Sequence, residues 1–364
     1  MPSFTLTFLR SGALLTACLM PMLLAACGSD VDPVATAQAV EQSQSAALTG
    51  STATTQKSAT SATKDTPSTS GADNTAAIPD SRDSRVIYWI DPRQTYAEGR
   101  KWNAATQVSG PNQVLADVQE PGIIGLGSDY ALSRVADPLD PTKAAFRHRI
   151  AEAFPTWGTV GARRSEISAD WSSKGATVMR GVDYWIAFAV KFEPDMFGSG
   201  NGGASLMDFH QVPDSGENWL PSSLSMYSGD NDISFVVRWD SGQPTVASNP
   251  PSKSLWSESA PSTTQWHRFV MKVRLNWDAA QKPYVRIWRA VGNGPVQLIV
   301  SHDGPNDYNN NAPYIPQKFG LYRWDDWSGK PTRTMYTKGF YVIKDQPGSP
   351  ALDEHVLMSL LGKI

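Results

Sequence analysis

Three short polar motifs hold the residues of this chain whose types and spacing could do chemistry. Arg164-Ser165-Glu166 and Asp208-Phe209-His210 each carry two polar side chains at alternate positions, and Lys318-Phe319-Gly320-Leu321-Tyr322 spaces a lysine, a glycine and a tyrosine in the same way. Alternate residues of a β-strand project to one face of its sheet. If the three faces line one sheet, two cations that can bind an anion and two side chains that can transfer protons gather there. Gly320 among them is predicted to leave room for a ligand close to the sheet.

The elements that must position these motifs are predicted to be strands. Runs of β-branched and aromatic residues recur along the chain, and clusters of Gly, Pro, Asn and Asp separate them. Only Ala351–Leu361 carries an apolar stripe at helical spacing. We therefore expect an all-β fold, a two-sheet sandwich of the jelly-roll kind with a short C-terminal helix. The clearest strand-like runs are Tyr184–Phe192, Ile233–Trp239, Trp266–Trp277, Tyr284–Trp288, Val296–Val300 and Lys318–Trp324.

Composition separates a leader from one aromatic-rich body. All 13 tryptophans of the 364-residue chain fall between Trp89 and Trp327. Both cysteines, Cys18 and Cys27, precede that body, which can therefore form no internal disulfide and no cysteine-ligated metal site. The 32 Lys and Arg residues nearly balance the 35 Asp and Glu residues. A net charge of −3 argues against a protein that coats nucleic acid, so no nucleic-acid partner is expected.

Residues 1–26 are predicted to be a secretory signal peptide, because Arg10 precedes an apolar stretch that is too short for a spanning helix. The stretch ends in Leu24-Ala25-Ala26-Cys27-Gly28, which resembles the bacterial lipobox. The resemblance implies that Cys27 becomes the first residue and is acylated, so that the membrane is a partner through this lipid anchor only. Gly28 in place of an aspartate favours the outer membrane of the bacterial cell envelope, on its periplasmic or surface side. An ordinary signal peptide with an incidental Cys27 is the alternative.

Residues 27–84 are predicted to be a disordered tether. More than half of the residues between Ser29 and Asp80 are Ser, Thr or Ala, and none is aromatic. Such a segment buries too little apolar surface to offset the entropy lost on ordering. We expect it to hold a single β-sandwich domain, residues 85–364, away from the membrane.

The three polar motifs resemble R-[ST]-E, Q-x-H and K-x-G-x-Y, which occur in the same order in jelly-roll polysaccharide lyases. That group includes alginate lyases, glucuronan lyases and heparin lyase I. The resemblance runs from about Ala145 to Ile343 and is nearer to the heparin and glucuronan lyase branch. It implies a concanavalin-like jelly roll that cleaves an anionic, uronic-acid-containing polysaccharide. In that β-elimination a proton leaves C5 beside the carboxylate, and the C4 oxygen departs.

The resemblance also implies a role for each motif residue. Arg164 would neutralise the uronate carboxylate as charge moves into it, in the manner of an oxyanion hole. Tyr322 would pass a proton to the C4 oxygen and, in a syn elimination, would also remove the C5 proton. His210 would be the base in an anti elimination, or otherwise a hydrogen-bond partner of the carboxylate. A cation such as Lys318 or Arg323 nearby would help Tyr322 to ionise.

Asp208 departs from the pattern of the resembled family, because it aligns with the glutamine that helps to neutralise the uronate. A carboxylate there repels the carboxylate of the substrate unless it is protonated, turned away or paired with an arginine. Gln211 can substitute only if the strand bulges. Trp324 is expected to stack on a sugar ring. The predicted substrate-binding residues are Lys318, Arg323, Trp324, Asp208 and Gln211.

Less specific interpretations exist for each motif. His210 can be a half-buried sheet histidine, Tyr322 a rim aromatic, and Arg164 with Glu166 a same-face ion pair. A second class of function is a non-catalytic, lectin-like carbohydrate-binding lipoprotein on the same sandwich, since fold does not decide function. A sandwich glycoside hydrolase is disfavoured, because the pattern E-x-D-x-x-E of laminarinase-like enzymes is nowhere in the chain.

No cofactor is expected for this chemistry. Asn306–Asn311 offers oxygen ligands for a structural Ca²⁺ ion, but the segment lacks the spacing of a calcium loop, and a polar turn is favoured. The expected partners are an anionic polysaccharide and, through the lipid anchor only, the membrane. The protein is expected to be a monomer.

Overall fold

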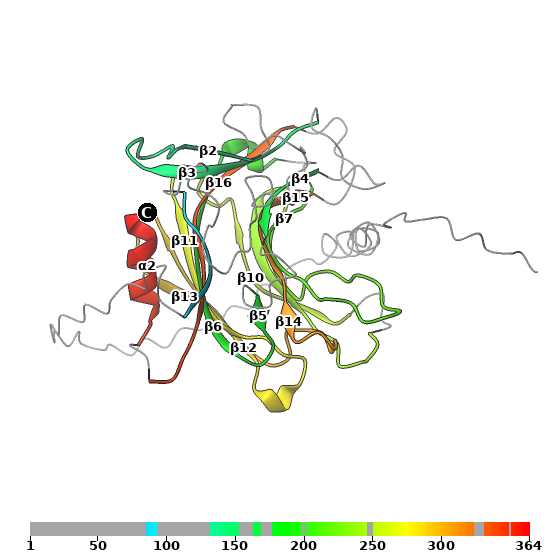
Figure 1. Ribbon diagram of the computed structural model, residues 1–364. Helices are drawn as coiled ribbons and strands as arrows, with labels where there is room; N and C mark the ends of the chain where they lie inside the picture. Colours follow the sequence, from blue (N-terminus) through cyan, green and yellow to red (C-terminus); the bar gives the residue numbers. More distant parts are fainter. Residues whose placement is uncertain are drawn as a thin grey trace, which may run out of the picture. The chain divides into compact units, whose positions relative to one another are not determined.

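The computed structural model describes residues 85–92, 132–152, 163–168, 177–198, 200, 202–245, 250–323, 331–348 and 351–364. The predicted signal peptide, the predicted lipidation site Cys27 and the predicted tether lie outside these residues, and so does Trp324. Two large β-sheets face each other, and one helix lies against the far side of the larger sheet (Figure 1). Among the described residues, no helix is long and apolar enough to cross a membrane. The predicted two-sheet jelly-roll sandwich is confirmed.

The larger sheet has eight strands. The long strand β16 (Arg333–Lys344) pairs with β3 along its first half and with β1 along its second half. Four of the predicted strand-like runs fall in this sheet, namely Tyr184–Phe192, Trp266–Trp277, Tyr284–Trp288 and Val296–Val300. Its order is β13 (Gln297–Asp303), β12 (Tyr284–Val291), β11 (His267–Arg274), β6 (Asp183–Phe192), β16, β3 (Ala144–Ile150) and β2 (Leu132–Ala136), with β1 (Val86–Ile90) beside β16.

The smaller sheet has six strands and carries the three polar motifs. Strands β7 to β10 follow one another in the chain, whereas β15 comes from a distant part of the sequence and inserts between β7 and β4. This insertion places the three motifs on three neighbouring strands. The order is β10 (Ser252–Ser259), β9 (Asp232–Arg238), β8 (Leu224–Ser228), β7 (Ala204–Phe209), β15 (Gln317–Arg323) and β4 (Arg163–Ser168), and a separate pair joins β14 (Tyr314–Ile315) to β5 (Val178–Met179).

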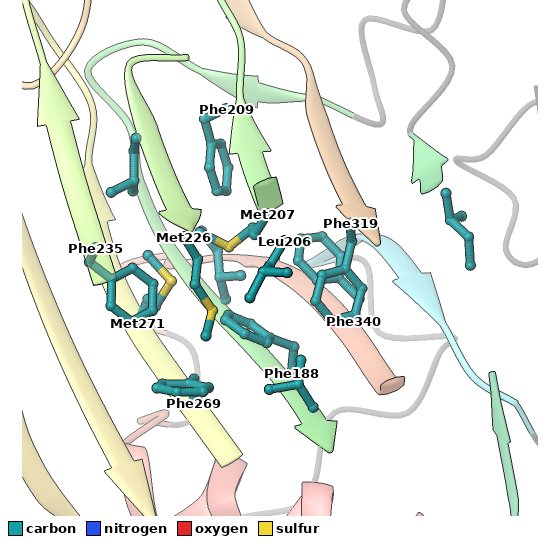
Figure 2. Close-up of a cluster of buried hydrophobic side chains, with 14 of the residues drawn as sticks. Phe188, Leu206, Met207, Phe209, Met226, Phe235, Phe269, Met271, Phe319 and Phe340 are labelled. Carbon is teal, nitrogen blue, oxygen red and sulfur yellow. The ribbon is translucent and has the colours of Figure 1, made fainter. Parts of the chain in front are cut away.

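The main hydrophobic core lies between the two sheets, and it decides which way the motif strands face. Figure 2 shows the aromatic and methionine side chains from both sheets that fill it. Phe319 of β15 stacks on Phe340 of β16, with ring centroids 4.7 Å apart, and meets Phe188 of β6 edge-on at 5.2 Å. Because residues alternate along a strand, Lys318 and Tyr322 project from the opposite face of the six-stranded sheet.

The helix α2 (Glu354–Lys363) covers the other face of the eight-stranded sheet, where its buried leucines pack with Trp185 of β6. The Asp353 carboxylate caps the first turn by accepting a hydrogen bond of 2.8 Å from the backbone N–H of Val356. The predicted helix at Ala351–Leu361 is confirmed, and it begins slightly later because Asp353 is its cap. Two 3₁₀ turns, η1 and η2, also occur among the described residues, at Pro194–Met196 and Ala279–Gln281.

Candidate active site

The three sequence motifs lie side by side on β4, β15 and β7. In the strand register, Tyr322 is opposite Arg164 of β4 and opposite Ser205 of β7, and Lys318 is opposite Asp208 of β7. We call the face of the six-stranded sheet that is turned away from the main core the outer face. The alternation within each motif predicts that Arg164, Lys318 and Tyr322 share this face with Asp208, and the structure places them there.

Arg164 lies between an acidic and an aromatic side chain. Its Nε is 3.3 Å from Oε2 of Glu166, and its Cζ is 4.6 Å from the ring centroid of Tyr322. The guanidinium therefore makes a cation–π contact with the phenol that the resemblance assigns to proton transfer. Glu166 fixes the arginine on one side, which leaves a positive charge directly beside the Tyr322 ring.

A β-bulge in β7 brings Ser205 to the outer face. The pairing of β7 shifts register between Ser205 and Met207, and the consecutive residues Leu206 and Met207 are both buried in the main core. The extra residue returns Ser205 to the side of Asp208, although the two are three positions apart. There the Ser205 hydroxyl donates a hydrogen bond to Oδ2 of Asp208. Strict alternation puts Ser205 on the core face, so sequence reasoning missed this residue.

His210 directly follows β7 and lies beside Asp208. Its Nε2 is 3.9 Å from Oδ2 of Asp208, an ion-pair distance, and the two side chains share a side as the motif predicts. The Ser222 hydroxyl lies 3.2 Å from Nδ1 and 3.1 Å from Nε2 of the same ring. The ring of Trp219 is nearly perpendicular to the imidazole, with ring centroids 6.3 Å apart. The backbone N–H of His210 donates to the carbonyl of Pro316, just before β15.

Arg238 of β9 extends this group of polar residues, and sequence reasoning missed it. One Nη of Arg238 donates 3.1 Å hydrogen bonds both to the backbone carbonyl of Ser222 and to the hydroxyl of Tyr227. The guanidinium also lies 5.4 Å from the Tyr227 ring centroid. Arg238 therefore holds the segment that presents the Ser222 hydroxyl to His210. The only signal in the sequence is its position at the end of the predicted strand Ile233–Trp239.

The polar side chains that the three motifs place on the outer face are buried. Arg164 and Asp208 are each 1% exposed, Lys318 is 3%, Tyr322 is 4% and His210 is 8% exposed. Charges interact more strongly away from water, and buried polar groups need partners. Together these residues can bind an anionic group next to two side chains that can transfer protons.

Gly320 is where β15, β4 and the other sheet approach one another closely, and room for a ligand over its outer side stays a prediction. Its φ of +149° is one that residues with a side chain rarely adopt. A Cβ atom here would lie 2.7 Å from Cα of Glu166 and 2.8 Å from Nδ1 of His148, and would also clash with the carbonyl oxygen of Ser165. The space beside Gly320 is therefore filled by the β4 backbone and by a histidine of the other sheet.

His148 of β3 links the two sheets beneath the site. Its Nδ1 donates to the carbonyl of Ser165 on β4 at 2.7 Å, and its Nε2 accepts from the Thr337 hydroxyl of β16 at 2.9 Å. Burial lowers the pKa of His148 to about 4, so the ring is neutral at pH 7. A neutral ring with one donor and one acceptor satisfies both partners. His148 thereby fixes the strand that carries Arg164.

Arg323 and Gln211 are held by backbone groups beside the sheet. Arg323 alternates with Tyr322 along β15, and its guanidinium donates to the carbonyl of Gly203 and lies against Gly202. The Gln211 side chain donates to the carbonyl of Asn218 at 2.9 Å, and the bulge of β7 precedes Asp208 rather than following His210. The structure therefore does not bring these two predicted binding residues to the outer face with the others.

The segment Asn306–Asn311 is bound to its neighbours. The Asp307 carboxylate is 2.7 Å from Nε of Arg180, and burial raises its pKa. The amide side chains of Asn306 and Asn309 bond to backbone groups of Asn276 and Ser241. In the part of the chain that the structure describes, no cluster of three or more His, Cys, Asp or Glu residues could hold a metal ion. These contacts are those of a polar turn.

Comparison with known proteins gives one family match and several similar structures. A family model described as polysaccharide lyase matches residues 116–340. An endo-β-1,4-glucuronan lyase from the fungus Trichoderma reesei is 18% identical, with a TM-score of 0.44 over 63% of this chain and 94% of that one. A marine alginate lyase from Aplysia kurodai is 15% identical, with a TM-score of 0.41 over 59% and 87%. A β-glucanase catalytic domain from Podospora anserina is 14% identical, with a TM-score of 0.38 over 59% and 77%. None of the curated proteins matches the chain.

Proposed function

The chain belongs to the polysaccharide lyase family, and from this membership we propose that it cleaves a uronic-acid-containing anionic polysaccharide by β-elimination. The observation that carries the proposal is the contact between Arg164 and Tyr322, on a face that also carries Asp208 and, just after β7, His210. A cation and two proton-transferring groups are what such an elimination requires.

In the proposed reaction Arg164 binds the carboxylate of the uronate. The proton on C5 is only weakly acidic while that carboxylate keeps its full negative charge. A planar guanidinium can form two parallel hydrogen bonds to a carboxylate and so stabilise the charge that moves into it. The ion pair with Glu166 holds the guanidinium in place before substrate binds.

His210 and Tyr322 are proposed to carry the two proton transfers. One side chain takes the proton from C5, and the electron pair of that C–H bond becomes the C4=C5 double bond. The C4–O bond breaks at the same time, and the leaving oxygen takes a proton from the other side chain. The polymer is thereby cut without water, and one new chain end carries the double bond.

A polymer panel tests this function. The purified protein is incubated with glucuronan, alginate, heparin-type and pectic polymers, and the ultraviolet absorbance of the C4=C5 double bond is followed. We expect a rise on at least one polymer. No rise in absorbance on any polymer, together with retention of the protein on a polysaccharide affinity gel, would contradict the lyase proposal and support a carbohydrate-binding protein.

We also propose that the protein is anchored in the bacterial cell envelope, at the outer membrane, by acylation of Cys27. The lipobox-like sequence Leu24-Ala25-Ala26-Cys27 supports this proposal. Cells that express the wild type and Cys27→Ser are labelled with a radioactive fatty acid. Label in the wild type alone is expected, and an unlabelled wild type would contradict the anchor.

A further inference from the structure

Asp208 and Glu166 are two acidic residues of the outer face with different surroundings. Glu166 pairs with Arg164, whereas Asp208 lies beside His210, with Nε2 of His210 at 3.9 Å from Oδ2 of Asp208. The same oxygen accepts a hydrogen bond from the Ser205 hydroxyl. The β7 bulge that turns Ser205 outward therefore also fixes the carboxylate against the imidazole.

His210 also contacts a hydroxyl group. The Ser222 hydroxyl lies within 3.2 Å of both ring nitrogens, and Arg238 fixes Ser222 through its backbone carbonyl. The ring of Trp219 packs nearly perpendicular to the imidazole. An imidazole that contacts both a carboxylate and a hydroxyl has a fixed orientation, which a general base requires.

We propose that Asp208 is a positioning residue that orients His210 and stabilises its protonated form, so that His210 is the base of the elimination. The proposal rests on the proposed function and divides its two proton transfers. His210 takes the proton from C5 and becomes an imidazolium beside the Asp208 carboxylate. The C4=C5 double bond forms, the C4–O bond breaks, and the departing oxygen takes its proton from Tyr322.

The charged groups around His210 give the sign of the effect. Asp208 is on β7, just before His210, and Lys318 of β15 is opposite Asp208. Arg238 of β9 bonds to the backbone of Ser222, whose hydroxyl contacts the ring. The Arg164–Glu166 pair lies further along the same face. Lys318 and Arg238 disfavour an imidazolium, and Asp208 at 3.9 Å favours it. Removal of the carboxylate takes away the contribution that favours the imidazolium, so the proton on His210 is held less tightly.

A proton NMR titration of the histidines tests this coupling without any substrate. The chain has five histidines, and His210→Gln identifies the resonance of His210. In Asp208→Asn we expect the titration midpoint of His210 to fall by about 1 to 3 pH units, the usual effect of an opposite charge at this distance. In Asp208→Glu, which keeps the charge, the midpoint should stay nearer to that of the wild type. An unchanged midpoint in Asp208→Asn would overturn the proposal.

Asp303→Asn is the matched control. Asp303 is a carboxylate of the other sheet, paired with Arg286 and adjacent in sequence to His302. Its removal should leave the midpoint of His210 in place and lower that of His302, because Asp303 raises the His302 pKa. If Asp208→Asn does not fold, Asp208→Ser takes its place, because it also removes the negative charge. The His210 midpoint should fall in that variant as well, and an unchanged midpoint would contradict the proposal.

Kinetics distinguish this role from simple repulsion of the substrate. If Asp208 orients His210, Asp208→Asn should lower kcat by about tenfold or more. The acidic limb of the pH profile should also move to lower pH, because His210 then loses its proton at lower pH. If the carboxylate only repels the uronate, the variant should instead lower KM and raise kcat/KM, which would overturn the proposal. If the wild type cleaves no polymer, the proposed function fails, while the titration still decides whether Asp208 and His210 are coupled.

Discussion

Arg164 is held in place by its surroundings before a substrate arrives. Its guanidinium lies against the Tyr322 ring, and Glu166 keeps it there with a buried ion pair. Breaking a buried pair by removing one partner is strongly destabilising, because the other charge is left alone. The contribution of Arg164 to chemistry is therefore best tested by a change that keeps its charge and alters its shape.

Arg164→Lys is such a change. A lysine keeps the positive charge but cannot form two parallel hydrogen bonds to a carboxylate. We expect kcat/KM to fall by roughly 100- to 1,000-fold, as on removal of an oxyanion-hole donor, with little loss of unfolding free energy. Arg286→Lys, at an ion pair of the eight-stranded sheet, is the matched control and should keep full activity. Activity of Arg164→Lys close to that of the wild type would argue against carboxylate neutralisation by Arg164.

The strand β15 shows how elements position these residues. Phe319 on its inner side stacks in the core, and Lys318 and Tyr322 on its outer side face the site. Gly320 allows the backbone of β4 and the His148 ring to approach β15 closely. The site therefore depends on a glycine that touches no proposed substrate group.

Gly320→Ala tests this dependence. The added Cβ would clash with β4 and with His148, and its φ is also unfavourable. We expect a loss of about 1 to 3 kcal/mol of unfolding free energy, or more, together with a loss of activity, because Arg164 and Tyr322 sit on the two strands forced apart. Gly348→Ala is the control, since Gly348 also has a positive φ, +81°, but nothing lies within 4 Å of its Cβ position. Equal losses in both variants would show that backbone strain, rather than crowding, is the cause.

The alternation of residues predicted the motif strands and the outward direction of Arg164 and Tyr322. It could not predict Ser205, because the two adjacent apolar residues Leu206 and Met207 become a bulge only when the partner strands impose their register. Ser222 and Arg238 were missed for a related reason. They reach His210 through contacts between β7, β9 and the connecting segment, and pairing between distant segments leaves no local periodicity in the sequence.

The two sheets are joined by the hydrophobic core and by polar links that cross it. His148 is such a link, since it bonds to β4 of one sheet and to β16 of the other. The sequence predicts a two-sheet sandwich from its many short strands. It does not predict that β15 inserts between β7 and β4, because that order depends on packing of the whole chain.

The pH dependence of stability should show the His148 link. Its pKa of about 4 in the folded protein is below the usual value of about 6.5. Between these values the unfolded chain binds a proton that the folded chain excludes, so the stability that neutral His148 contributes is present above pH 6.5 and is lost as the pH falls through 4.

The measurement is the unfolding free energy of wild type and His148→Gln in urea at pH 7 and pH 4. The destabilisation by the variant should shrink at pH 4 by roughly 3 kcal/mol. Taking the difference removes the contribution of buried carboxyls such as Asp195 and Asp307, whose raised pKa values act in the opposite direction. A destabilisation that is the same at both pH values would contradict a neutral, buried His148.

Tyr322, next to Arg164, is proposed to transfer a proton in a β-elimination. The most direct test is the initial rate of double-bond formation on the polymer that the panel identifies, for wild type, Tyr322→Phe and Tyr284→Phe. Tyr284 is a half-buried tyrosine of the eight-stranded sheet, bonded to Asp183, and serves as the control. We predict that Tyr322→Phe loses at least about 100-fold in rate while it stays folded and still binds the polymer, and that Tyr284→Phe keeps its activity. A folded Tyr322→Phe protein that forms the double bond at the wild-type rate would contradict proton transfer by Tyr322.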